Sequence, residues 1–119
     1  MNDVTRSGLT EMDPSFAAKY ANADRLVVRK DDRVYLCGGL ANKADSNPSG
    51  AARRVGVIPE GFRPSYPVAG IVGLTSDGVD CVGSLEVSKA GVVTVSAPAH
   101  AAQGHWSFFW DGTSWPSAA

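Results

Sequence analysis

The stretch SLEVSKAGVVTVS (residues 84–96) decides the fold class. Polar and apolar side chains alternate through most of it, as they do along a strand with one buried face. Lys89, Ala90 and Gly91 lie between the two alternating runs and have the composition of a tight turn. The stretch therefore predicts two antiparallel strands joined by a hairpin.

Similar runs recur along the chain from residue 25 onward, separated by turns rich in Gly, Asp and Pro. Seven or eight short strands at intervals of about ten residues are typical of a β-sandwich or barrel. We therefore expect an all-β fold, an antiparallel, jelly-roll-like β-sandwich over residues 25–119. The expected strands cover residues 26–29, 33–38, 53–58, 68–74, 79–87, 92–96, 106–110 and 113–115.

The N-terminal residues 1–24 have a different pattern. The first half has no periodicity and resembles an extended arm. Asp13 and Pro14 then suit the cap and the first position of a helix. Phe16 and Tyr20 follow at i, i+4 spacing with alanines between them, which predicts a helix of about two turns. Two interpretations remain open: a helix folded back on the body, or a docking arm that uses Phe16 and Tyr20 and becomes ordered on a partner.

Composition limits the possible partners. A chain of 119 residues is one domain. Its 11 basic and 12 acidic side chains leave a net charge of -1, so there is no overall field to attract nucleic acid or an anionic membrane. No apolar run approaches the roughly 20 residues that cross a bilayer. No basic segment followed by an apolar run opens the chain, so we do not expect export by a signal peptide. We expect neither nucleic-acid binding nor membrane insertion.

Signals of enzymatic chemistry are absent from the sequence. It contains no C-x-x-C, H-E-x-x-H, G-x-S-x-G or P-loop motif. His100 and His105 lie five residues apart in a loop without a neighbouring Cys or carboxylate, which favours surface histidines over metal ligands. We expect no catalytic residue, no metal and no cofactor.

Cys37 and Cys81 each lie among aliphatic residues. Buried free thiols are the expected state. A single disulfide remains the alternative if the two strands are adjacent.

The most unusual local feature is the aromatic segment near the C-terminus. On a strand, Trp106, Phe108 and Trp110 share one face and Phe109 lies on the other, and Trp115 follows after an Asp-Gly turn. A strand that is apolar on both faces indicates burial on both, against the core and against another subunit. An aromatic platform for sugar is the alternative. The candidate subunit or glycan contacts are Trp106, Phe108, Trp110 and Trp115.

Four segments, in order, carry a resemblance to a known family. They are VRKDDRVYL (28–36), IPEGFRPS (58–65), the pair GSLEV (83–87) and GVVTV (91–95), and FFWDGTSWP (108–116). Together they span most of the chain. In order and spacing they resemble the small C-terminal head domains of bacteriophage tail-fibre and minor tail proteins, especially those of phages that infect actinobacteria.

The resemblance implies a non-enzymatic head, usually homotrimeric, at the tip of an adsorption device, where it can contact host cell-wall polysaccharide. It implies assembly in the host cytoplasm and a final location in the virion, beside other tail or capsid proteins. Such heads normally follow a long stem, and the sequence contains none, so attachment is expected through the N-terminal arm or the aromatic strand. The alternative is a capsid decoration protein that binds the phage head through its N-terminal arm.

Overall fold

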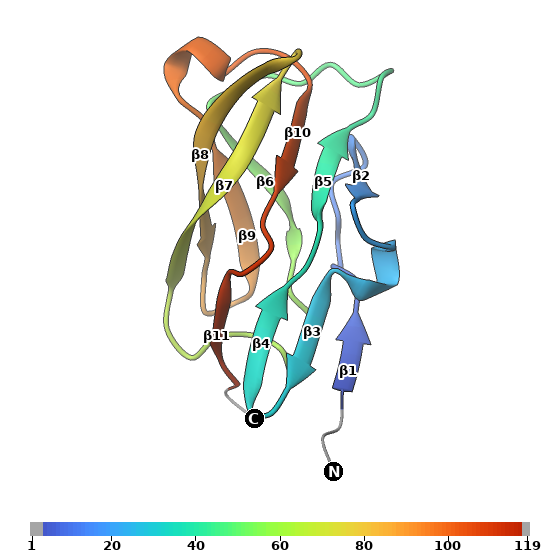
Figure 1. Ribbon diagram of the computed structural model, residues 1–119, viewed down its shortest axis with the longest axis vertical. Helices are drawn as coiled ribbons and strands as arrows, with labels where there is room; N and C mark the ends of the chain where they lie inside the picture. The colour runs from blue at the N-terminus through green and yellow to red at the C-terminus, as the bar shows by residue number, and fades with distance from the viewer. Residues whose placement is uncertain (1–3, 118–119) are drawn as a thin grey trace.

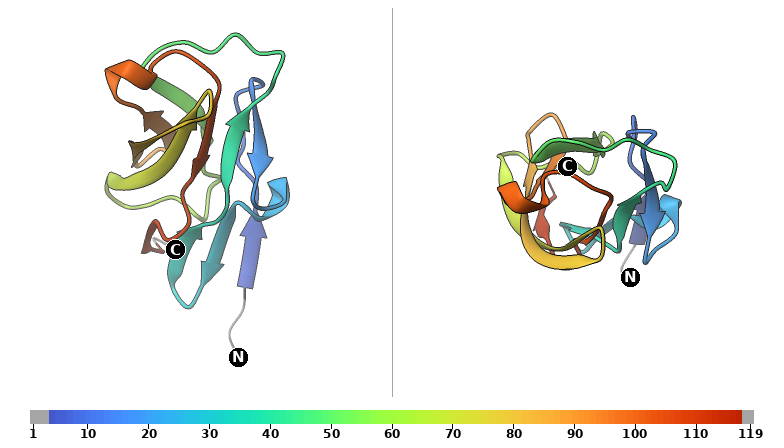
Figure 2. Two further views of the ribbon diagram at one scale, coloured as in Figure 1. Left: turned by 45° about the horizontal axis from the view of Figure 1, so that its top comes forward. Right: turned by 90° about the horizontal axis from the view of Figure 1, so that it is seen from above.

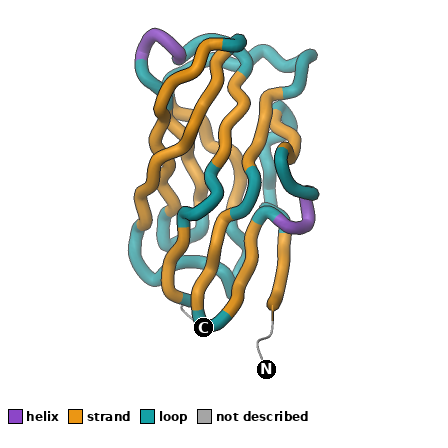
Figure 3. The backbone as a smooth tube through the Cα atoms, viewed as in Figure 1, coloured by secondary structure: helices purple, strands orange, loops and turns teal. Residues whose placement is uncertain are grey.

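The computed structural model describes residues 4–117. About 50% of the chain is in strands, and turns and loops make up most of the rest (Figures 1 and 3). The strands form two antiparallel sheets, which confirms the all-β, sandwich-like prediction. The smaller sheet has the order β1-β3-β4-β11, with β1 at Val4–Ser7, β3 at Val27–Lys30, β4 at Arg33–Leu36 and β11 at Ser114–Pro116.

The larger sheet contains seven strands in the order β2-β5-β10-β7-β8-β9-β6. Its long central hairpin pairs β7 with β8 over nine residues in each strand. The strands are β2 (Phe16–Lys19), β5 (Gly39–Asn42), β6 (Ala52–Val57), β7 (Val68–Ser76), β8 (Val79–Val87), β9 (Val92–Ser96) and β10 (Trp106–Phe109).

This larger sheet curls until its two edges almost meet, and the ring is visible from above in Figure 2. Thr10 lies in the segment that precedes the edge strand β2. It exchanges two backbone hydrogen bonds of 2.8 Å with Val57 on the opposite edge strand β6. The N–H of Asp13 also donates to the carbonyl of Val55 at 3.0 Å. The segment that leads into β2 therefore closes most of the gap between the two edges.

Alternation along the strands produces the core. Val72 and Leu74 of β7 point inward, and Leu85 and Val87 of β8 do the same. All three tryptophans of the chain and Phe108 join them with at most 1% of their surface exposed. The sandwich is therefore filled by aliphatic residues from the central hairpin and by aromatic residues from the C-terminal segment.

The predicted N-terminal helix is wrong. Residues 16–19 form strand β2, which pairs with β5, and the nearest helix is a three-residue 3-10 turn, η1, at Ala23–Arg25. Instead of capping a helix, the Asp13 carboxylate accepts hydrogen bonds from the Ser15 hydroxyl at 2.6 Å and the Ser15 N–H at 2.9 Å. Pairing with the edge of a sheet satisfies the backbone of this segment, so tertiary contacts override the helix propensity of its alanines.

The N-terminal segment is part of both sheets. β1 pairs with β3 in the small sheet, and β2 pairs with β5 in the large one. The predicted boundary between residues 24 and 25 therefore does not separate an arm from a body within the described chain. Residues 1–3 of the predicted arm lie outside the described residues.

Candidate functional site

The four predicted aromatic contacts lie in the core. Each of Trp106, Phe108, Trp110 and Trp115 is 1% exposed or less. The indole N–H of Trp106 donates to the Ala101 carbonyl at 2.8 Å. The other two indoles donate in the same way to the carbonyls of residues 37 and 62. These rings leave no surface for a sugar or a second subunit. The prediction that they form contacts is therefore wrong, and they are core residues.

The two residues of the predicted docking arm, Phe16 and Tyr20, differ in their exposure. Phe16 is 2% exposed and packs edge-on against Phe108, with ring centroids 6.0 Å apart. It is a core residue and is not available to a partner. Tyr20 is 61% exposed and packs edge-on against Phe109, with centroids 5.6 Å apart. Of the pair, Tyr20 alone keeps the accessibility that docking requires.

An exposed apolar surface lies on the outer side of β10, β7 and β8. Phe109 is directly opposite Gly73, and Gly73 is directly opposite Val82, so the three residues form a row across three strands. Ile71 lies two residues from Gly73 on the same side of β7. The exposed fractions are 75% for Ile71, 65% for Val82 and 45% for Phe109. We call the surface formed by Tyr20, Ile71, Gly73, Val82 and Phe109 the outer face.

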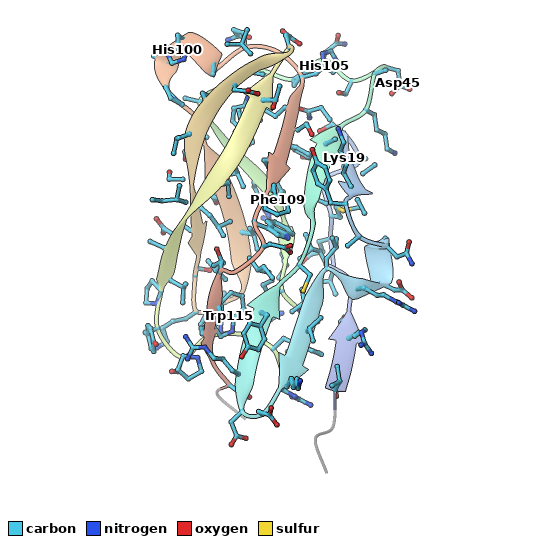
Figure 4. The ribbon with its side chains drawn as sticks, viewed as in Figure 1. Lys19, Asp45, His100, His105, Phe109 and Trp115 are labelled. Carbon is cyan, nitrogen blue, oxygen red and sulfur yellow. The ribbon has the colours of Figure 1, made fainter. Side chains whose placement is uncertain are left out.

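Polar groups border the outer face. The Lys19 ammonium donates to the Ser107 hydroxyl at 3.0 Å, and the Tyr20 hydroxyl lies 3.3 Å from the same oxygen. On the β8 side, the Thr75 hydroxyl donates to the Asp80 carboxylate at 3.1 Å. Figure 4 looks onto this surface, with Phe109 near the middle of the molecule and Lys19 nearer the upper end.

A second candidate site surrounds Arg53 at the upper end of the large sheet. The residue is 7% exposed, and within residues 4–117 its guanidinium forms no ion pair. The guanidinium stacks on Trp106, with its central carbon 3.6 Å from the ring centroid. It donates to the carbonyls of Gly50, Ala102 and Gly104 and to the side chain of Asn42 over distances of 2.6–3.1 Å.

This cluster connects the two loops of the upper end. Arg53 donates to Gly50 in the loop of residues 43–51 and to Ala102 and Gly104 in the loop of residues 98–105, and His105 also joins the two loops. Its ring Nε2 lies 3.0 Å from the Ser46 carbonyl, and its Nδ1 lies 3.6 Å from a carboxylate oxygen of Asp77. Burial lowers the pKa of the Arg53 guanidinium, while the charge of Asp77 acts in the opposite direction. The geometry is that of a structural clamp with neutral acceptors.

A polar cavity of about 310 Å³ opens beside this clamp. Its lining supplies carboxylate, hydroxyl, amide and guanidinium groups, with one edge of apolar surface. The residues that form it are Asp13, Ser15, Phe16, Asn42, Asn47, Pro48, Ser49, Ala52, Arg53 and Arg54. Such a lining could accept a small, hydroxyl-rich ligand.

The histidines and the cysteines show no sign of a metal site. Figure 4 shows His100 and His105 at the same end of the molecule but apart from each other. Among the residues that the structure describes, no three His, Cys, Asp or Glu side chains are grouped so that they could hold a metal ion. Cys37 and Cys81 are both free, as expected, but they are half-buried rather than fully buried.

The four motifs of the family resemblance meet at the opposite end of the fold, around Phe62. The guanidinium of Arg29 lies 5.2 Å from the Phe62 ring centroid and donates to the Gly61 carbonyl at 2.7 Å. The Trp115 indole donates to the Phe62 carbonyl at 2.7 Å. The N–H of Ile58 donates to the Gly91 carbonyl at 2.7 Å. We call the group of Arg29, Phe62, Gly91 and Trp115 the Phe62 corner.

Comparison of the chain with protein-family models, curated proteins and solved structures gives no match. Over residues 4–117, no helix combines the length and the apolar character needed to cross a membrane.

Proposed function

We propose that this chain is a non-enzymatic structural protein of a bacteriophage particle. In this proposal it is a small minor tail or tail-fibre head protein that takes part in host attachment as a homotrimer. It assembles in the host cytoplasm and then resides in the virion, in contact with other virion proteins.

The Phe62 corner is the observation that carries the proposal. The resemblance to phage head domains rests on four separate segments, and one residue from each segment contributes to this single corner. Arg29, Gly91 and Trp115 are far apart in sequence, yet each contacts the segment 58–65: Arg29 and Trp115 contact residues 61 and 62, and Gly91 accepts from the N–H of Ile58. Motifs that pack together in three dimensions are expected to recur together, because each one supports the others. The ordered set is therefore a stronger sign of relatedness than four isolated motifs.

The proposal assigns the binding function to surfaces. Attachment to host polysaccharide requires hydrogen-bonding groups arranged to meet sugar hydroxyls, and the cavity beside Arg53 supplies them from Asn47, Ser49 and Arg54. Those residues come from a loop and a strand end at one extremity of an elongated molecule, which measures 44 × 25 × 22 Å. A tip of this kind is suited to meeting a cell surface while the opposite end is held by the particle.

The second candidate is a capsid decoration protein. That role was expected to use a free N-terminal arm, but residues 4–19 contribute strands β1 and β2 to the two sheets. A decoration protein built on this fold would instead have to bind the capsid through its folded surface.

Immunogold electron microscopy of intact virions of the phage that encodes this chain tests the proposal. The antibody is raised against the recombinant protein, and antibody preadsorbed with that protein is the control. Label confined to the tail end supports the attachment role. Label distributed over the capsid overturns it in favour of decoration. Unlabelled particles from a lysate in which the antibody detects the protein would overturn the virion assignment.

A further inference from the structure

We infer that the outer face is the surface through which copies of this chain associate. The inference goes beyond the proposed function, because a face that meets the same face of a second copy forms a two-fold contact that pairs copies of this chain. It is drawn from the exposed side chains of β7, β8 and β10 and from their polar borders.

The first argument is the composition of the surface. Outward-facing positions of a sheet exposed to water normally carry polar or charged residues. Here the outward positions in the middle of the sheet are Ala69, Ile71, Gly73 and Thr75 on β7, and Phe109 and Ser107 on β10. None of these six residues is charged. On the adjacent β8 the outward positions are Asp80, Val82, Ser84 and Glu86, so the uncharged surface ends at two carboxylates on that strand. A sheet face of this kind resembles the buried centre of an interface, where charged residues are depleted.

The second argument is shape. A Cβ atom added at Gly73 would meet no atom within 4 Å, so the backbone is bare on this side. The exposed side chains of Phe109 and Val82 stand directly beside it on the neighbouring strands. The row therefore has a hollow at its centre with an apolar side chain on each side. A side chain such as Ile71 of a second copy would fit into that hollow.

The third argument is area. A fully exposed aromatic side chain presents about 150–250 Å². On that scale, Tyr20, Ile71, Val82 and Phe109 together expose roughly 400 Å² at the fractions given above. A stable interface buries about 800 Å² on each partner. The four side chains supply about half of this, so a stable contact must also bury the polar residues that border the outer face.

The fourth argument is charge at the borders. Lys19 lies on the β2 side of the surface, whereas Asp80 and Glu86 lie on the β8 side. Four strand spacings of about 4.8 Å separate the two borders. A second copy that places its β8 border over the β2 border of the first brings opposite charges together. Self-association is therefore favoured by charge as well as by apolar area.

Sedimentation velocity of the recombinant full chain over a wide concentration range tests the inference. The test variants are Ile71→Lys and Val82→Lys. The matched control is Val79→Lys. Val79 is on β8, like Val82, and is 62% exposed, but it lies at the hairpin end beside Ser76 and His100, away from the outer face. Near-ultraviolet circular dichroism, which is sensitive to the packing of the buried tryptophans, verifies that each variant is folded.

We expect the unmodified chain to self-associate and each test variant to dissociate, with a dissociation constant raised by about tenfold or more, while the control remains unchanged. A chain that is monomeric at every concentration would overturn the inference. An oligomer that survives both test variants would also overturn it, and would leave the proposed oligomer standing with a different contact. Because the immunogold experiment reports on location alone, failure of one proposal does not imply failure of the other.

Discussion

Replacement of the buried Arg53 by alanine provides the most demanding test of the structure. The guanidinium makes four hydrogen bonds to loop acceptors and stacks on Trp106. Truncation removes all of these contacts together. It also leaves three backbone carbonyls and the Asn42 side chain oxygen without this donor, although Asn42 still accepts from the N–H of Trp106.

The expected loss of stability follows from these contacts. A hydrogen bond to a charged group contributes about 1.5–3 kcal/mol, and a stacked cation adds about 0.5–2 kcal/mol. The sum is an upper bound, since burial of the charge opposes folding and water can reach loop carbonyls after truncation. We therefore expect Arg53→Ala to lower the free energy of unfolding by about 3 kcal/mol. Arg53→Lys should recover little of this, because one ammonium cannot reach acceptors on two loops or stack in the same way.

The neighbouring Arg54 provides a matched control. Its ion pair with Glu11 spans 3.9 Å, and both side chains are more than half exposed. Arg54→Ala should therefore change the free energy of unfolding by about 0.5 kcal/mol or less. Urea unfolding followed by tryptophan fluorescence measures both variants. If Arg53→Ala loses no more stability than Arg54→Ala, the assignment of Arg53 as a clamp is refuted.

Three further predictions concern separate features. Gly91→Ala should be more destabilising than Gly78→Ala in thermal denaturation, by about 1–3 kcal/mol. Both glycines have φ near +85°, so the backbone strain is similar. A new Cβ at Gly91 would lie 2.6 Å from a carbonyl oxygen, whereas at Gly78 it would meet nothing within 4 Å. Equal losses of stability in the two variants would contradict this difference in packing. The hydrogen bonds from the Ser15 hydroxyl and then from its N–H hold the pKa of Asp13 below its usual 3.8. The stabilisation that depends on this charge is present above pH 3.8 and is lost as the pH falls through the lower folded pKa. The difference in stability between the unmodified chain and Asp13→Asn should therefore shrink in acid, and a difference independent of pH would count against it. Burial raises the pKa of the Cys37 thiol, so its alkylation should be slower in the native protein than in urea. Equal alkylation rates under the two conditions would contradict this prediction.

The alternation of side chains was enough to predict most of the strands. β3, β4 and β6–β11 were expected close to their observed positions, because period-two alternation and turn residues are local properties of the chain. β1, β2 and β5 were not predicted as strands. They are short and rich in small or polar residues, and they exist because their backbone groups find partners on distant strands.

The candidate surfaces were less predictable. Parity along β10 correctly separated Phe109 from Trp106 and Phe108, but parity cannot say which side faces the core. The predicted contacts were placed on the side that turned out to be buried, and the exposed residue was Phe109. Ile71 and Val82 occupy outward positions of their strands, beside Phe109. The sequence does not show this, because the placement depends on the register of β10, β7 and β8.

Alternation and turn chemistry depend on neighbouring residues alone, so the antiparallel β class of this protein can be predicted from its sequence. The burial of Arg53 depends on the tertiary structure: the sequence places this residue at the start of the expected strand 53–58, and the fold encloses it between a tryptophan and loop carbonyls. The physical reason is that burial depends on which distant segments pack against a residue. Register, closure of the sheet and the exposed face all arise from such long-range contacts.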